Sequence, residues 1–281
     1  MRIASFFGIP LYLHWSWFLL LAFVSVTSGG FSVLIFLAVF LFVLLHEYGH
    51  CFAAKYYELE VTDITLYPIG GVARIPSFGE VNPWVRELII ALAGPAVNIV
   101  LCGIAILILL LTGVDDTPIS LVASHAFMLN LILAIFNLLP IFPMDGGRVL
   151  RASLYGIMQD YEHSTEIAVR IGQVFACGMI FLAVMTGNIF MGVIFFLVCL
   201  GSQAELLQVK RQASLERLKE HLAKELDKPE LVNATLPQLL AVIEDVDDEE
   251  LRRLLTLDEW EHYLLPMLKQ HLESQQNQQS S

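Results

Sequence analysis

Long apolar runs are the feature that most limits what this chain can fold into. A transmembrane helix needs about 20 mostly apolar residues, and the first 200 residues contain several runs of that kind. Hydrophobic residues make up 56% of the whole chain, well above the share in an ordinary soluble protein. The sequence therefore predicts an all-α polytopic membrane protein with about six spans, near residues 11–28, 31–54, 86–112, 119–139, 165–186 and 188–209.

The character of the chain changes near residue 200. The residues after this point carry a net charge of −7, against −5 for the longer part before it. Apolar residues recur at helical spacing over residues 202–227, and short helices are expected near 236–244, 248–257 and 258–272. We therefore predict a membrane domain over residues 1–200 and a soluble, helical tail over residues 201–281. The acidic tail argues against nucleic-acid binding, which needs a basic surface.

The Lys and Arg residues of the first 200 residues all fall on one side of this six-span arrangement. They lie at the N-terminus, in the longer connections near 55–85 and 140–164, and at the ends of the spans that adjoin these connections. The three short connections on the other side carry none. By the positive-inside rule, the N-terminus, the long connections and the tail face the cytoplasm. We therefore expect a multi-pass protein of the cell membrane, in contact with the lipid bilayer on its outer surface.

The second predicted span ends in the motif HEYGH. Its two histidines, His46 and His50, are four residues apart, so a helix places them on one face. Two imidazoles at this spacing suit one zinc ion, and Glu47 between them can take a proton from water. Histidines that simply reach interfacial water are the alternative interpretation, but that interpretation leaves an acidic residue at the end of a span unexplained.

A catalytic zinc site needs a third protein ligand and one open position. The fourth span returns to the same side in NLLPIFPMDGGR, which places Asp145 at about the depth of His46. A carboxylate is a normal zinc ligand. The alternative is that Asp145 caps a helix that begins near Gly146. The matching depth of the two motifs favours the ligand interpretation, and with it one zinc ion per chain.

Three motifs together resemble the site-2 protease family of intramembrane zinc metalloproteases. They are HEYGH at 46–50, AGPAVN at 93–98 and NLLPIFPMDGG at 137–147. In addition, LYPIGGVARI at 66–75 resembles that family's hydrophobic hairpin loop. The resemblance covers about residues 8–200. The 55–85 connection is too short for a PDZ domain and the tail does not resemble a pair of CBS domains, so the chain resembles a branch that has neither.

The resemblance implies a role for each motif residue. His46, His50 and Asp145 correspond to the zinc ligands, and Glu47 corresponds to the catalytic acid and base. A small membrane-associated β-hairpin is expected near residues 66–75.

Four further residues are candidates for binding substrate. Asn98 and Asn137 fall on family motif positions, where each either hydrogen-bonds the substrate backbone or the developing oxyanion, or joins two helices. Gly70 and Gly71 suit a hairpin turn at which an extended substrate segment could pair by strand addition. A plain loop is the alternative for this segment.

The function that these observations predict is that of a zinc metalloendopeptidase cleaving transmembrane or membrane-proximal segments of other proteins. The family implies a membrane-tethered regulator as substrate, such as an anti-sigma factor or a transcription factor precursor; remnants of signal peptides are another candidate. An ion or metal transporter would use the same residues but needs access from the outer side, where the chain offers only His125, Asp115 and Asp116. A non-catalytic scaffold does not require Glu47. The tail is a candidate for binding a regulatory partner or for self-association.

Overall fold

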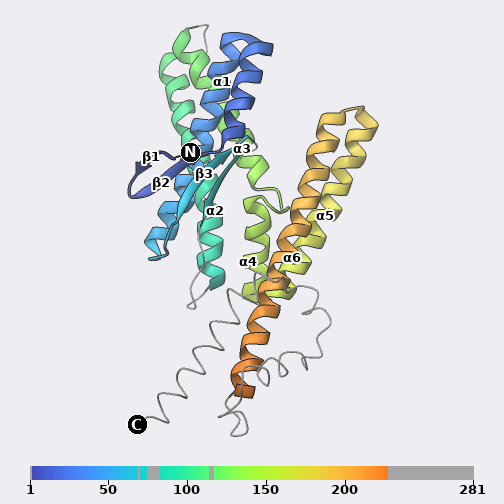
Figure 1. The fold of residues 1–281 in the computed structure, drawn as a ribbon. Coiled ribbons are helices and arrows are strands. Elements are labelled where there is room, and N and C mark those ends of the chain that lie inside the picture. Colours follow the sequence, from blue (N-terminus) through green and yellow to red (C-terminus); the bar gives the residue numbers. More distant parts are fainter. Residues whose placement is uncertain (1, 69, 75–82, 114–116, 227–281) are drawn as a thin grey trace. The chain divides into compact units, whose positions relative to one another are not determined.

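A computed structural model of the protein defines residues 2–68, 70–74, 83–113 and 117–226. Residues Met1–Gln203 form one compact unit, which contains the HEYGH motif and Asp145. Four short strands and six helices make up the described chain (Figure 1). They are β1 (Arg2–Phe6), β2 (Ile9–Leu13), α1 (Trp15–Tyr56), β3 (Asp63–Tyr67), β4 (Gly70–Arg74), α2 (Pro83–Thr112), α3 (Pro118–Asn137), α4 (Asp145–Met158), α5 (Tyr161–Thr186) and α6 (Ile189–Leu226).

The predicted all-α membrane architecture is confirmed. Among the described residues, five helical segments are long and apolar enough to cross a membrane: Gly30–Tyr56, Pro83–Thr112, Pro118–Asn137, Tyr161–Thr186 and Ile189–Ser214. The first predicted span is only partly right. Residues Ile9–Leu13 form a strand, and the apolar helical segment that comes after it, Trp15–Ser28, is shorter than a full span. The helices predicted beyond residue 227 lie outside the described residues.

Helix α1 folds back on itself between these two segments. A straight helix of its 42 residues would be about 63 Å long. Yet the residue before it is held against β3, because the backbone N–H of His14 donates to the carbonyl of Leu66 at 3.0 Å. The ten residues from Tyr56 to Leu66 span at most roughly 35 Å. The first two predicted spans are therefore two antiparallel arms within α1, and the chain reverses direction near Ser28–Gly30.

Aromatic packing holds the two arms together. The Trp17 ring lies 5.3 Å from the Phe36 ring and 5.4 Å from the Phe40 ring, centroid to centroid. Trp17 and Phe40 are buried, and both belong to the same apolar cluster as the inner face of the sheet. The short first arm is thus tied to the arm that carries the HEYGH motif.

The four strands form one sheet in the order β1-β2-β3-β4 beside α1 (Figure 1). Pairing is antiparallel within β1–β2 and β3–β4 and parallel between β2 and β3. Residues Ile9, Leu11 and Leu13 alternate inward and bury against α1. The hairpin predicted near 66–75 is present, but its two glycines are the first residues of β4 rather than its turn. The N-terminal hairpin β1–β2 was not predicted.

Helix α2 is the element against which the other helices are placed. It packs against α1, α3 and α4, and α4 packs in turn against α5. The long connection predicted near 140–164 contains α4. Because HEYGH lies near the end of α1 and α4 begins at Asp145, the two helices that carry the candidate ligands both rest on α2.

The contact between the arms of α1 generates the first prediction. Substituting Trp17→Ala removes the two aromatic pairs that join the arms and leaves a cavity in the buried cluster, so the protein should be destabilised by about 3–5 kcal/mol. The thermal unfolding temperature of the purified protein in detergent measures this loss. The control is Phe23→Ala on the same arm, because the Phe23 side chain is 63% exposed. Equal unfolding temperatures for the two variants would contradict the proposed packing of the arms.

Candidate metal centre

Three side chains converge where α1 meets the start of α4. The Nε2 atom of His46 lies 3.0 Å from Oδ2 of Asp145, and Nε2 of His50 lies 3.2 Å from the same oxygen. The two histidine Nε2 atoms are 3.1 Å apart. All three residues are buried. Three potential ligand atoms thus form a nearly equilateral triangle, although 95 residues or more separate Asp145 from the histidines.

The size of this triangle matches a zinc site. Zinc binds imidazole nitrogen and carboxylate oxygen at about 2.0–2.2 Å in tetrahedral geometry. Ligand atoms around such an ion are separated by roughly 3.3 Å, close to the observed edges of 3.0–3.2 Å. The donor set of two imidazoles and one carboxylate is a catalytic type, which leaves a fourth position for water or substrate. Within the described part of the chain, no other cluster of metal-ligating side chains meets this geometry.

The orientation of the ligands is fixed by their neighbours. Nδ1 of His50 lies 2.6 Å from the carbonyl oxygen of Ile90 in α2. With the proton on Nδ1, the lone pair of Nε2 faces the centre of the triangle, as a metal ligand requires. Burial alone would raise the pKa of Asp145, but hydrogen bonds from Nε2–H of His46 and His50, which form when no metal is bound, outweigh it and hold that pKa well below its usual range. The surroundings thus favour the ionised carboxylate.

The structure also tests the alternative that Asp145 is the N-cap of a helix that begins near Gly146. The N-cap of α4 is Met144, and Asp145 is the first residue inside the helix. The capping interpretation is therefore wrong. The tight path at this point requires the two glycines after Asp145. A Cβ on Gly146 would overlap the carbonyl groups of Leu138 and Leu139, and one on Gly147 would lie 2.7 Å from the backbone nitrogen of Phe142.

A glycine on α2 makes room for the histidines. A Cβ on Gly94 would lie 2.7 Å from Nε2 of His46 and still closer to the ring of His50. Such separations do not occur between real atoms, so any larger residue would displace the ligands. The second residue of the AGPAVN motif therefore forms one wall of the candidate metal centre through the absence of a side chain.

Glu47 lies beside the ligands and faces the sheet. Its Oε2 accepts a hydrogen bond from the backbone N–H of Ala73, at 3.1 Å. A Cβ on Gly71 would lie 2.6 Å from Cγ of Glu47, so this strand approaches closely only because residue 71 is glycine. Since Ala73 directs its N–H toward Glu47, that group does not pair with β3. Strand β4 is the edge of the sheet, and this edge lines the site.

These groups surround a cavity of about 230 Å³. Its lining comprises His46, Glu47, His50, Gly71, Val72, Ala73, Asn137, Pro143, Asp145 and Arg148. Of the four predicted substrate-binding residues, Asn137 and Gly71 line the cavity, whereas Asn98 and Gly70 do not. The Asn98 side chain is fully buried in α2, and neither polar atom of its amide has a hydrogen-bond partner among the described residues.

Sequence reasoning did not single out four residues of this lining: Val72, Ala73, Pro143 and Arg148. The guanidinium of Arg148 lies one helical turn after Asp145, 3.9 Å from its Oδ1. The HEYGH and DGG motifs do not point to Arg148, although its i+3 spacing from Asp145 on a helix could have done so. The Ala73 amide is a backbone group, which residue identity does not reveal.

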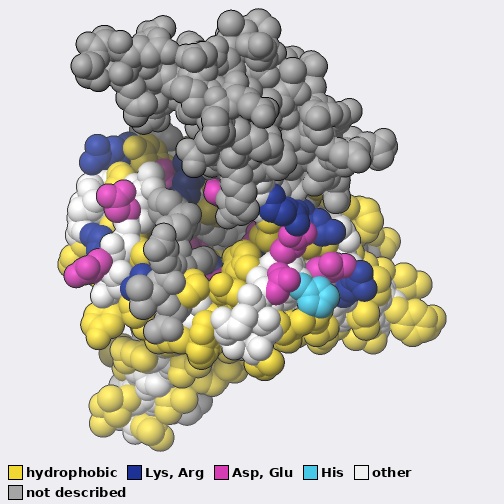
Figure 2. Space-filling model, turned by 90° about the horizontal axis from the view of Figure 1, so that it is seen from below, with side chains coloured by type: hydrophobic (Ala, Val, Ile, Leu, Met, Phe, Trp, Pro, Cys, Tyr) yellow, Lys and Arg dark blue, Asp and Glu magenta, His cyan; other side chains and the backbone are white. Residues whose placement is uncertain are grey.

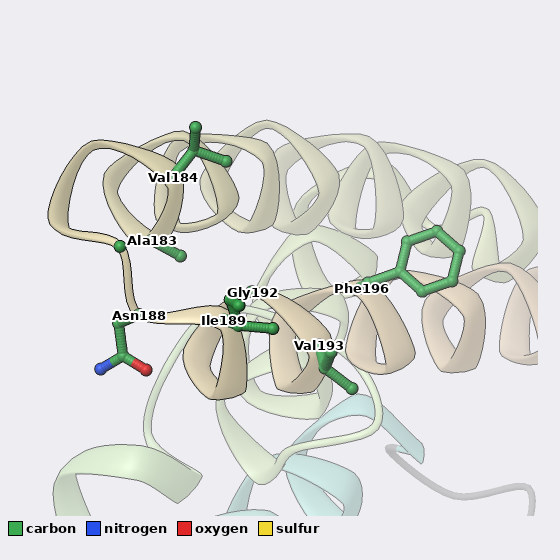
Figure 3. Close-up of a pocket in the computed structure, with 8 residues that line it drawn as sticks. Ala183, Val184, Asn188, Ile189, Gly192, Val193 and Phe196 are labelled. Atoms are coloured by element: carbon green, nitrogen blue, oxygen red, sulfur yellow. The ribbon is translucent and has the colours of Figure 1, made fainter.

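A second hollow lies far along the α5–α6 hairpin and has a different character. It is lined by Ala183, Val184, Gly187, Asn188, Ile189, Gly192, Val193 and Phe196, and Figure 3 shows these residues on both sides of the interhelical turn. Asn188 is the one polar side chain among them. This groove carries no titratable group for catalysis.

The close fit at Gly94 generates a second prediction. Substituting Gly94→Ala forces a methyl group into both histidine rings, so zinc affinity should fall by roughly 10- to 100-fold, the usual effect of disturbing groups that orient ligands. Metal content of the purified protein after dialysis against a weak chelator measures the loss. Gly103→Ala on the same helix is the control, because no described atom lies within 4 Å of its Cβ position. Full zinc occupancy in Gly94→Ala would refute the idea that the histidine ligands need the space left by Gly94.

Comparison with known proteins places this geometry in a family. The model of Peptidase family M50 matches residues 34–124 and 114–180. A zinc metalloprotease of Methanocaldococcus jannaschii is 35% identical over 247 residues, which is 83% of this chain and 68% of that protein. A relative from Synechocystis sp. is 34% identical over 206 residues, 67% of this chain and 52% of that protein.

A solved structure agrees with the sequence comparisons. The structure of a site-2 protease from Methanocaldococcus jannaschii superposes with a TM-score of 0.57 at 34% identity, covering 73% of this chain and 94% of that one. The expected family resemblance is thereby confirmed, together with the predicted fold class and the zinc cofactor. The chain belongs to peptidase family M50 and is a zinc metalloprotease of the membrane.

Proposed function

We propose that this protein is an endopeptidase that hydrolyses peptide bonds within or next to the membrane spans of other proteins. The observation that carries the proposal is the meeting of three groups in one cavity: a ligand triangle sized for zinc, the carboxylate of Glu47, and the edge of strand β4. A transport site needs only the ligands. The edge strand and the acid beside it suit a site that holds an extended peptide and cuts it.

Glu47 is the proposed general base and acid. His46, His50 and Asp145 would hold the zinc ion, which when bound would supply a water molecule of lowered pKa and a Lewis acid for the scissile carbonyl. Glu47 takes a proton from the attacking water and delivers it to the nitrogen of the leaving amine. Its position supports this role, because it lies one residue from His46 and lines the same cavity.

The edge of β4 is the proposed substrate-binding surface. A peptide in a membrane helix has its carbonyl and N–H groups bonded to one another, so cleavage requires local unwinding. An unwound segment can pair with an exposed sheet edge, where main-chain hydrogen bonds supply affinity. The Ala73 N–H is a donor at that edge and stands next to Glu47. Arrival of a substrate carbonyl at Ala73 would release Glu47 to act on water.

Two polar side chains of the cavity are proposed to assist. Asn137 and Arg148 both line it, and Arg148 lies 3.9 Å from Asp145. A fixed amide and a guanidinium can stabilise negative charge that develops on the scissile carbonyl oxygen. The roles of Asn98 and Gly70 in substrate binding stay predictions, since both lie outside the cavity lining.

The orientation in the membrane is also a proposal. Charged side chains gather on the end of the molecule seen in Figure 2, whereas hydrophobic side chains dominate the rest of the visible surface. The positive-inside rule assigns the connections with Lys and Arg to the cytoplasm, so the active site is proposed to open on that side. Substrates would then be membrane proteins, such as tethered regulators or signal-peptide remnants. A tail partner and the domain boundary near residue 200 stay predictions.

Substitution of the proposed base tests the function. In Glu47→Gln, cleavage should fall by about 10²–10⁴-fold, the usual contribution of general acid–base catalysis, while zinc content stays near that of the wild type. The measurement compares fragments of membrane proteins from cells that carry either form, seeking new chain ends inside or beside spans. Glu60→Gln, at an exposed site, should cleave like the wild type. A zinc-loaded wild type without such fragments would sink the protease proposal and favour transport.

Accessibility to a membrane-impermeant maleimide tests the orientation. In a background with the four native cysteines replaced by alanine, Ile189→Cys should be labelled in right-side-out membrane vesicles, because it lies at an interhelical turn on the proposed outer side. Glu60→Cys should react only after the vesicles are opened. The reverse pattern would show that the active site faces outward.

A further inference from the structure

A fully buried ion pair joins α2 to α4 outside the ligand triangle. Nε of Arg151 donates to Oε1 of Glu87 at 2.9 Å, and Nη2 of Arg151 donates to the same oxygen at 2.5 Å. The side chains are 4% and 1% exposed. The guanidinium also lies over two aromatic rings, 4.9 Å from the Phe142 centroid and 4.8 Å from that of Tyr161. Neither charge lines the catalytic cavity.

Stability alone does not account for this pair. Removing two charges from water costs several kcal/mol for each ion, so a buried ion pair is often no more stabilising than apolar residues of the same volume. What such a pair does supply is a fixed geometry, because each partner tolerates few positions of the other. The pair between Glu166 and Arg170 on α5 contrasts with it. There the two residues are one turn apart on one helix, and the arginine side chain is 73% exposed.

The arginine end of the pair lies on the helix that begins with Asp145. Arg151 and Asp145 are six residues apart on α4, about 9 Å along the helix axis. Phe142, whose ring lies beneath Arg151, belongs to the segment that leads into Asp145. The carbonyl of Phe142 accepts a hydrogen bond from Oγ of Ser202, at 2.7 Å. The segment that leads into α4 is therefore contacted from two sides, by Arg151 and by Ser202.

The glutamate end of the pair is tied to the histidines. Glu87 lies one helical turn before Ile90 on α2. The carbonyl of Ile90 is the group that orients His50. One turn of α2 thus holds one ligand directly, through Ile90, and a second ligand through Glu87 and α4. The separation of the ligands across the two helices depends on this turn.

We propose that Glu87 and Arg151 form a positioning pair that sets the distance between Asp145 and the two histidines, and thereby the affinity for zinc. The proposal rests on the zinc site described above, but not on any particular substrate. Neither residue touches the metal or the scissile bond; both act through the placement of α4 against α2.

Zinc affinity is the measurement that tests this proposal, because it needs no substrate. The variants are Glu87→Gln, Arg151→Gln and Arg151→Lys in the full-length protein in detergent. Competition with a chromophoric chelator gives the dissociation constant for Zn²⁺, and Co²⁺ loaded in place of Zn²⁺ gives an absorption spectrum that reports ligand geometry. We expect zinc binding to weaken by roughly 10- to 100-fold and the Co²⁺ spectrum to change. The matched control is the double variant Glu166→Gln with Arg170→Gln. It should keep the zinc affinity and the Co²⁺ spectrum of the wild type.

Unfolding temperatures separate positioning from general stabilisation. Zinc raises the unfolding temperature to an extent that grows with its affinity for the folded protein. A pair that only stabilises the fold would lower the unfolding temperatures of the zinc-free and zinc-loaded forms equally. A positioning pair makes the zinc-induced rise smaller. If Arg151→Gln does not fold, Arg151→Lys replaces it in the zinc measurements, because Lys keeps the charge but lacks the planar guanidinium that lies over Phe142.

The reversed pair, Glu87→Arg with Arg151→Glu, completes the experiment. Its charges are again opposite, so it should bind zinc more tightly than either of its single substitutions. Wild-type zinc affinity and an unchanged Co²⁺ spectrum in the folded single variants would overturn the proposal. Failure of the protease assay alone would not, because the zinc measurements are independent of cleavage.

Discussion

The close approach of α1 to α2 is the constraint on which the rest of the structure depends. A Cβ on Gly49 would lie 2.7 Å from the carbonyl oxygen of Ala93, and one on Gly94 would enter the histidine rings. Helices in a membrane associate through such small residues, which let their backbones approach and pack. Only at this separation does Ile90 reach His50. The metal centre is thus a consequence of helix packing in which two absent side chains matter as much as the ligands themselves.

The three candidate ligands could be picked out from the sequence because their proximity is local or depends on depth in the membrane. His46 and His50 share a helix face through a spacing of four residues, and the full-length spans after them are plain from their apolar length. Counting spans then returned Asp145 to the same side of the membrane as the histidines, and the structure brings the three together. Neither step required knowledge of side-chain packing, only of helical periodicity and membrane thickness.

The parts that could not be predicted depend on contacts between distant segments or on backbone groups. Strand β2 lies within an uninterrupted apolar stretch, where periodicity cannot distinguish a buried strand from a helix. The donor beside Glu47 is the amide of residue 73, which every residue except proline would offer. Asn98 and Asn137 had equal standing as motif residues, yet only Asn137 reaches the cavity. Glu87, the ion-pair partner of Arg151, is 64 residues away in the sequence, and no local sequence pattern predicts the pairing.

The short first arm of α1 has a consequence for the surrounding bilayer. Residues Trp15–Ser28 rise about 21 Å, whereas the hydrocarbon core is about 30 Å thick. An arm of this length whose turn lies at one boundary would end roughly 9 Å short of the other, on the side where β2 precedes it. Local thinning of the bilayer is one way to accommodate such a hydrophobic mismatch. Where water is scarce, unpaired main-chain groups are costly, so the edge of β4 has more to gain from an arriving peptide strand than the same edge would have in solution.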